Sequence, residues 1–301
     1  MAKTAGEATA KRGLRWALWV AAFLLMVAAA VHQRRTGPTH PFRGAVALDG
    51  ETISFRLPRS AVSGHDAVLS VAAPAGVEGT LRWRRLRSDD DWHETELARE
   101  GERLSGALPT QPPAGKVEYR LLLGSPRGEA SIPAAGEEAI VLRFRGAVPA
   151  WLLLPHVLTM FVAMLVAVRA GLGALFAAAG TARLARWALG GITLGGMILG
   201  PLVQQRAFGA LWTGWPLGGD LTDNKTLVMW LAWIVAVLAV RPGAGERRPW
   251  ARLLLAAATV VTLAVYLVPH SLRGSELDFR ALEGGVSPTE AVRTGRPEAP
   301  R

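Results

Sequence analysis

An uncharged, mostly apolar run occupies residues 146–168, with the sequence GAVPAWLLLPHVLTMFVAMLVAV. About 20 helical residues are enough to cross the hydrocarbon core of a bilayer. The run contains no Asp, Glu, Lys or Arg that would oppose insertion. The run therefore predicts a membrane-spanning helix, and similar stretches lie on both sides of it.

Four further stretches lack Asp, Glu, Lys and Arg and are mostly apolar. They are residues 16–33, 187–205, 226–240 and 253–272. The stretch 226–240 is short, and we expect it to span only if Lys225 and Arg241 extend outward from its two ends and the bilayer thins locally. Together the five stretches predict a multi-pass membrane protein whose helices contact the lipid bilayer.

The first stretch has a second interpretation as a cleaved signal peptide. Ala28, Ala29 and Ala30 offer small residues before His32, as a cleavage site requires. The length of the apolar run favours an uncleaved anchor. Either interpretation exports the segment that follows.

Basic residues near the span ends predict the orientation of the chain. The segments before the first span, between spans two and three, and between spans four and five carry nine of the ten excess positive charges. We expect these segments on the cytoplasmic side of a bacterial inner membrane, with residues 34–145, 206–225 and 273–301 exported. The net charge of +10 is then a topology signal, and we expect no nucleic-acid partner.

Composition excludes several classes of protein. The 301 residues are enough for two ordinary domains, and half of them are hydrophobic while only 19% are charged, which excludes a disordered chain. The chain has no cysteine. This excludes a disulfide scaffold, thiolate catalysis, cysteine-ligated zinc and iron–sulfur clusters.

Between residues 42 and 145 the pattern changes to short alternating segments separated by Gly, Pro, Asp and Ser. Strands are expected at residues 52–57, 67–72, 79–86, 92–97, 117–123 and 139–144. This spacing is typical of an all-β, immunoglobulin-like sandwich. We expect Trp83, Trp92 and Tyr119 to lie in its core.

The predicted fold is thus an all-α membrane bundle of five spans with an inserted, exported β-sandwich. Residues 1–36 form the cytoplasmic N-terminus and first anchor, and residues 37–147 form the sandwich. Residues 148–272 form a four-helix bundle with an outward loop at 204–225. Residues 273–301 form an exported tail, expected to be disordered because Gly, Pro and charged residues dominate from Gly284 onward.

Of the three histidines within the predicted spans, two follow a proline. His156 follows Pro155 near the outer end of span two, and His270 follows Pro269 at the outer end of span five. An ionisable residue inside a span is a candidate functional residue, because its burial must be compensated. The alternative is an interfacial histidine that bonds only to water or to a backbone carbonyl.

The outward loop at 204–225 concentrates aromatic, glycine and charged residues. Trp212 and Trp215 alternate with glycines, which suits aromatic faces packed along a flat apolar ligand. Thr222 or Asp223 is expected to cap the helix of span four, so part of the loop's polarity is structural.

The order of these parts resembles the membrane haem-handling proteins of cytochrome c assembly, over residues 156–270. Members of that family have an outward histidine, two spans, a tryptophan-rich loop, two more spans and a second outward histidine. This chain lacks the family's compact Trp-x-Trp-Asp core, because Trp215 is followed by Pro216 to Gly219 before Asp220. It also has few spans, and its exported sandwich has no family counterpart.

The resemblance implies that haem is the cofactor and that His156 and His270 are its metal ligands. The remaining cofactor-binding residues that it implies are Trp212 and Trp215 on the ring, Arg206, Lys225 and Arg273 at the propionates, and Asp220 and Asp223 holding the loop or those cations. No Cys-x-x-Cys-His acceptor is present, so the chain does not itself become a c-type cytochrome.

Three functions therefore remain open. The first is haem binding in haem handling, cytochrome maturation or electron transfer. The second is a non-enzymatic interaction protein, whose residues 42–145 bind an exported or membrane protein. The third is a quinone or lipid-headgroup enzyme that uses Asp220, Asp223 and His270 for acid–base chemistry. Whether the chain is an enzyme is left undecided by the sequence.

Overall fold

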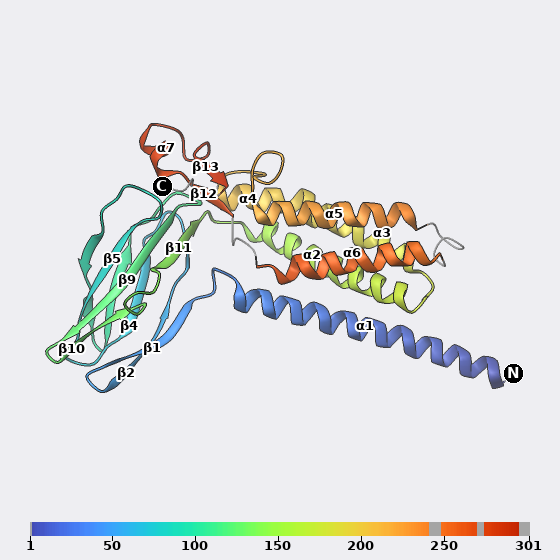
Figure 1. The fold of residues 1–301 in the computed structure, drawn as a ribbon, viewed down its shortest axis with the longest axis horizontal. Helices are drawn as coiled ribbons and strands as arrows, with labels where there is room; N and C mark the ends of the chain where they lie inside the picture. The colour runs from blue at the N-terminus through green and yellow to red at the C-terminus, as the bar shows by residue number, and fades with distance from the viewer. Residues whose placement is uncertain (1, 241–247, 270–273, 295–301) are drawn as a thin grey trace. The chain divides into compact units, whose positions relative to one another are not determined.

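A computed structural model of the chain describes residues 2–240, 248–269 and 274–294 (Figure 1). It divides into two compact units. The membrane unit comprises Met1–Gly37, Val148–Val203 and Gly214–Leu272. The β unit comprises Pro38–Ala147, Gln204–Thr213 and Arg273–Arg301. The segment between spans three and four is therefore divided between the units, where we had expected one loop.

The membrane unit is built from long apolar helices. They are α1 (Ala2–Thr36), α2 (Ala150–Leu175), α3 (Thr181–Ile192), the π-helical segment η1 (Thr193–Leu199), α4 (Gly200–Phe208), α5 (Leu221–Ala239) and α6 (Pro249–Leu267). Helices α3, η1 and α4 are continuous. Among the residues that the structure describes, five helices are long and apolar enough to cross a membrane, as the five expected spans require, and the chain is a multi-pass membrane protein.

Small residues allow the helices of the membrane unit to approach closely. A Cβ added at Gly191 would lie 2.8 Å from the Cβ of Ala163 on α2, and one added at Gly196 would lie 2.8 Å from Thr226 on α5. Gly191 and Gly196 of span three thus face neighbouring helices of the same chain. Larger buried side chains, such as Trp233, complete the core of this unit.

The π-helical segment η1 interrupts span three just before Pro201. Proline has no backbone N–H, and its ring displaces the carbonyl four residues earlier. The helix widens at this point, because the N–H of Gly200 bonds to the carbonyl of Gly195, five residues back. The helix does not end at Pro201 but continues through α4 to Phe208.

The β unit contains short sheets whose strands pair antiparallel, except for the parallel pair of β3 and β11. Its strands up to Arg145 are β1 (Phe42–Leu48), β2 (Glu51–Leu57), β3 (Ser60–Val62), β4 (Ala67–Ala72), β5 (Glu78–Arg85), β6 (His93–Glu96), β7 (Ala98–Glu100), β8 (Arg103–Leu108), β9 (Lys116–Ser125), β10 (Gly128–Ile132) and β11 (Ile140–Arg145). The largest sheet has the order β3-β11-β9-β5-β6, with β10 also paired to β9, and a second has the order β4-β8-β7. Strands β1 and β2 form a hairpin. All six expected strands are present within two residues of their predicted bounds.

One apolar core joins these sheets, and Tyr119 lies inside it. Its side chain is fully buried, and its hydroxyl donates to the carbonyl of Pro58 at 2.7 Å. Burial raises the pKa of Tyr119 well above its ordinary value. Trp83 is only partly buried at the edge of this core, stacked on His93, and Trp92 lies outside it. The expectation of three core aromatics is therefore met by Tyr119 alone, because Trp92 precedes strand β6 and packs against the guanidinium of Arg84 instead.

The segment after span five is ordered from residue 274 to residue 294, which corrects the expected disordered tail over that range. It contains β12 (Ser275–Leu277), α7 (Phe279–Glu283) and β13 (Val292–Thr294). Phe279 is 2% exposed and packs in a small apolar cluster with Ala114, Leu277 and Ala291. Tertiary packing thus orders a segment whose composition alone predicts a coil.

Ion pairs reinforce this docking within the β unit. Glu276 accepts from Lys116 at 2.6 Å, Glu283 from Arg85 at 2.5 Å, and Asp89 from Arg280 at 2.6 Å. Burial, together with the nearby charge of Arg143, lowers the pKa of Lys116. The backbone N–H of Leu277 also donates to the carbonyl of Ala114 at 3.1 Å.

Candidate functional site

The most informative polar residue of the membrane unit is His156, in the second turn of α2. Its Nδ1 lies 3.0 Å from the carbonyl oxygen of Gly195, and the side chain is half-buried. A carbonyl oxygen can only accept a hydrogen bond, so Nδ1 must carry the proton. In the neutral imidazole the other nitrogen, Nε2, then bears a lone pair. His156 is thereby fixed in the tautomer that can ligate a metal through Nε2.

The π-helical segment supplies the acceptor for this histidine. Gly195 lies within η1, where the regular helical hydrogen-bond ladder is interrupted. π-Bulges are frequent at functional sites. Met160, one turn after His156, packs against Gly195, and Gly200 lies beside the imidazole, where a Cβ would make an ordinary contact 3.7 Å from its Cε1.

The end of α6 lies at the same level of the membrane unit as the first turns of α2. The hydroxyl of Tyr266 donates to the carbonyl of Met160 at 2.8 Å. Lys225, in the first turns of α5, donates from Nζ to the carbonyl of Val268 at 2.5 Å. His270 follows Val268 by two positions in the sequence and, like Arg273, lies outside the described residues.

The position of Lys225 differs from the sequence prediction. Helix α5 begins at Leu221, five residues before the predicted span, and its 19 residues make it long enough to cross. Lys225 is consequently inside the helix and only 8% exposed, so it does not extend outward as expected. Its buried ammonium group is compensated by the carbonyl of Val268.

Asp220 has the capping role that we had assigned to Thr222 or Asp223. Its Oδ1 accepts from the backbone N–H of Thr222 at 2.7 Å and of Asp223 at 3.4 Å. The cap moves upstream because the helix starts earlier. Asp223 is buried in the first turn, where a negative charge also stabilises the helix. The cap thus gives Asp220 a structural role, and Asp223 lies in the first turn that it caps.

The residues of the predicted tryptophan-rich loop are divided between the units. Trp212 and Arg206 belong to the β unit, whereas Trp215 belongs to the membrane unit. Trp215 is 68% exposed, and its backbone N–H donates to Oδ1 of Asn224 at 2.6 Å. A joint tryptophan cover over a flat ligand therefore stays a prediction.

The membrane unit thus contains two polar contacts, one of His156 with Gly195 and one of Lys225 with Val268. Across residues 2–240, 248–269 and 274–294, no three His, Cys, Asp or Glu side chains lie close enough to hold a metal ion. A ligand set made of His156 with one further histidine remains compatible with this geometry. Sequence reasoning missed the Gly195 carbonyl and Tyr266.

The chain was compared with known proteins. No family model matches it, and no curated protein matches its sequence.

Proposed function

We propose that the membrane unit binds haem through His156 and His270 and acts in haem handling, cytochrome maturation or electron transfer. The observation that supports this proposal is the Nδ1 hydrogen bond from His156 to Gly195. Metal-ligating histidines almost always donate their second ring N–H to a carboxylate, carbonyl or water. The contact therefore leaves the lone pair on Nε2 of His156, the nitrogen that would ligate the iron.

The donor set suits haem better than a small metal ion. Haem iron needs only two neutral imidazoles from the protein, because the porphyrin supplies the other ligands. Lys225 is a buried cation with three N–H donors, one of which bonds to Val268. Lys225 is therefore a candidate to pair with a propionate of the haem. Arg206 and Arg273 are the two other cations that the sequence suggests for this role. When bound, haem would supply one-electron chemistry or be the cargo itself.

The proposal includes the location of the chain. Basic residues favour an N-terminus in the bacterial cytoplasm and a β unit outside the inner membrane. The haem site would then lie at the outer membrane face. We further propose that the β unit is an immunoglobulin-like sandwich, because its alternating strands share one apolar core.

The proposal is tested by the optical spectrum of the full chain, purified in detergent from cells supplied with a haem precursor. We expect about one haem per chain and a sharp reduced-minus-oxidised band. His156→Ala and His270→Ala should each lose most of the bound haem, because each removes one axial ligand.

A matched control is His32→Ala, which removes an exposed histidine near the outer end of α1. It should retain the spectrum of the unsubstituted chain. A colourless chain from haem-replete cells would contradict the proposal, as would equal haem loss in all three variants. If His156 only bonds to the backbone, His156→Ala should lower thermal stability without altering any colour.

Partner binding by the β unit is a second candidate function, favoured by one surface of the largest sheet. Trp92 lies under the guanidinium of Arg84, whose carbon is 4.7 Å from the ring centroid, and Arg82 lies at 5.6 Å. Tryptophan and arginine are the side chains most enriched at binding hot spots. Replacing the Trp92 side chain by alanine should then abolish the chain's co-purification with a specific exported protein while leaving any haem spectrum unchanged. Unaltered co-purification would contradict this candidate.

A further inference from the structure

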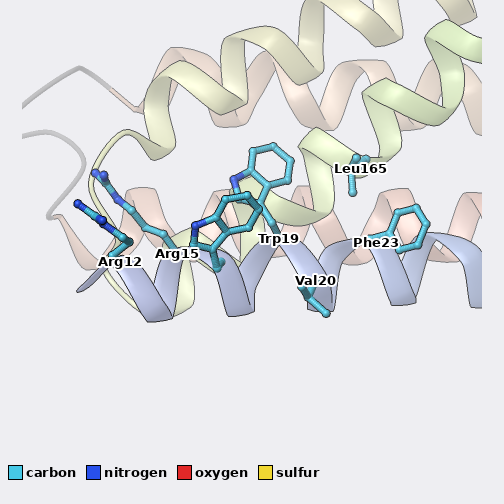
Figure 2. Close-up of a pocket in the computed structure, with 7 residues that line it drawn as sticks. Arg12, Arg15, Trp19, Val20, Phe23 and Leu165 are labelled. Atoms are coloured by element: carbon cyan, nitrogen blue, oxygen red, sulfur yellow. The ribbon is translucent and has the colours of Figure 1, made fainter. Parts of the chain in front are cut away.

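A pocket of about 870 Å³ opens between α1 and α2 in the membrane unit, away from His156 along the helices. It is lined by Arg12, Arg15, Trp16, Trp19, Val20, Phe23 and Leu165. Figure 2 shows Arg12 and Arg15 at one end of this α1 pocket and Phe23 at the other, with Leu165 directed from α2 toward α1. The proposed haem site does not use any of these residues.

The lining changes in chemistry along the helix axis. Two arginines come first, the indoles of Trp16 and Trp19 follow, and aliphatic and aromatic side chains complete the wall. Arg15 and Phe23 are eight residues apart, which corresponds to about 12 Å along an α-helix. This length approaches the thickness of one leaflet's hydrocarbon layer, roughly 15 Å. The order of charge, interfacial aromatic and apolar surface matches a phospholipid lying parallel to the helix.

Positive charge at this end of the pocket lacks a described counterion. No ion pair within the described parts of the chain involves Arg12, Arg15 or Arg169. Arg169 is only 4% exposed, and its guanidinium carbon lies 5.5 Å from the ring centroid of Trp19, which lines the pocket. Its Nε and Nη1 have no hydrogen-bond partner among the residues that the structure describes.

A buried arginine without a counter-charge is costly in a membrane protein. A negative group beside Arg12 and Arg15 would compensate part of this cost, because Arg169 packs on Trp19, which lines the same pocket. The phosphate of a lipid headgroup is the anion present at this depth, and arginine binds phosphate in a bidentate manner.

We propose that the α1 pocket binds one anionic phospholipid, with its phosphate at Arg12 and Arg15 and an acyl chain along Val20, Phe23 and Leu165. The lipid would attach α1 to the rest of the membrane unit and compensate the charge of Arg169.

Native mass spectrometry of the full chain in detergent tests this proposal. The probes are phosphatidylglycerol and phosphatidylcholine with identical acyl chains. We expect one phosphatidylglycerol to remain bound, in preference to phosphatidylcholine. The double variant R12Q/R15Q should weaken phosphatidylglycerol binding by on the order of tenfold, because each interfacial arginine contributes attraction to anionic lipid.

The matched control R34Q/R35Q removes the same charge from the other end of α1 and should leave binding unchanged. A second variant, Leu165→Trp, keeps all charges but fills the apolar part of the pocket, and it should also weaken binding. Equal loss in both double variants would overturn the proposal by showing non-specific attraction. Displacement of the lipid by millimolar inorganic phosphate, or unchanged binding in Leu165→Trp, would overturn it in favour of a simple anion site.

Discussion

Phe279 provides the sharpest test of whether the segment after span five is an integral part of the β unit. Its ring is 2% exposed and contacts the cluster of Ala114, Leu277 and Ala291. The guanidinium carbon of Arg85 lies 5.0 Å from the ring centroid, which adds a cation–π interaction. Phe279→Ala therefore removes both apolar burial and an electrostatic contact.

The magnitude follows from the burial. Truncation of a fully buried phenylalanine to alanine costs about 3–5 kcal/mol in protein cores. We expect about 3 kcal/mol here, because only four fully buried residues form the cluster. Since each 1.4 kcal/mol is a factor of ten, the population of the detached segment should rise on the order of 100-fold.

Limited trypsin digestion in detergent measures this population. Cleavage after the exposed Arg280 in α7 requires local opening, and its rate follows the open fraction when reclosing is fast. The rate for Phe279→Ala should rise about 100-fold over the unsubstituted chain. The control Val286→Ala truncates a side chain of the same segment that is 39% exposed, and it should change the rate little. Equal cleavage rates for all three chains would refute the docking of this segment.

Two further substitutions test the β unit and the membrane unit separately. In a Tyr266→Phe background, Tyr119 is the sole tyrosine of the chain. Burial raises the pKa of Tyr119 in the folded protein. The free energy of unfolding should therefore fall by about 1.4 kcal/mol per pH unit above about pH 10, where the tyrosine of the unfolded chain loses its proton. Near-ultraviolet phenolate absorbance should then rise only as the protein unfolds, and a smooth titration near pH 10 in folded protein would contradict this. Gly171→Ala places a Cβ 2.1 Å from Oγ1 of Thr259. It should reduce the free energy of unfolding by about 1–3 kcal/mol and so lower the thermal midpoint. The control Gly190→Ala adds a Cβ that meets nothing within 4 Å, and it should not lower the thermal midpoint. Equal thermal midpoints for the two variants would argue against the close contact of α2 and α6.

Local patterns were sufficient to predict most elements of this fold. The spans were predictable because runs such as residues 146–168 contain no charge over the length of a bilayer. The strands near Tyr119 were predictable because buried and exposed positions alternate, as in β9. The expectation failed in the segment 274–294, where order depends on Phe279 reaching Ala114, more than 160 positions away in the sequence.

The candidate site was only partly accessible from the sequence. His156 was identifiable because an ionisable residue in an apolar run is rare. Its acceptor at Gly195 was not identifiable, because the π-helical segment arises from a shift in the backbone hydrogen bonds just before Pro201. Lys225 was assigned to the membrane surface because the apolar run ends beside it, whereas capping by Asp220 extends the helix and buries the lysine.

Rescue of an axial ligand tests the central claim most directly. His156→Gly should leave a cavity beside Gly195 and Gly200, and imidazole added to the detergent-purified variant can enter it. We predict a low-spin haem spectrum in the unsubstituted chain, its loss in His156→Gly, and its return with imidazole. A low-spin spectrum that persists in His156→Gly without imidazole would show that His156 is not a haem ligand.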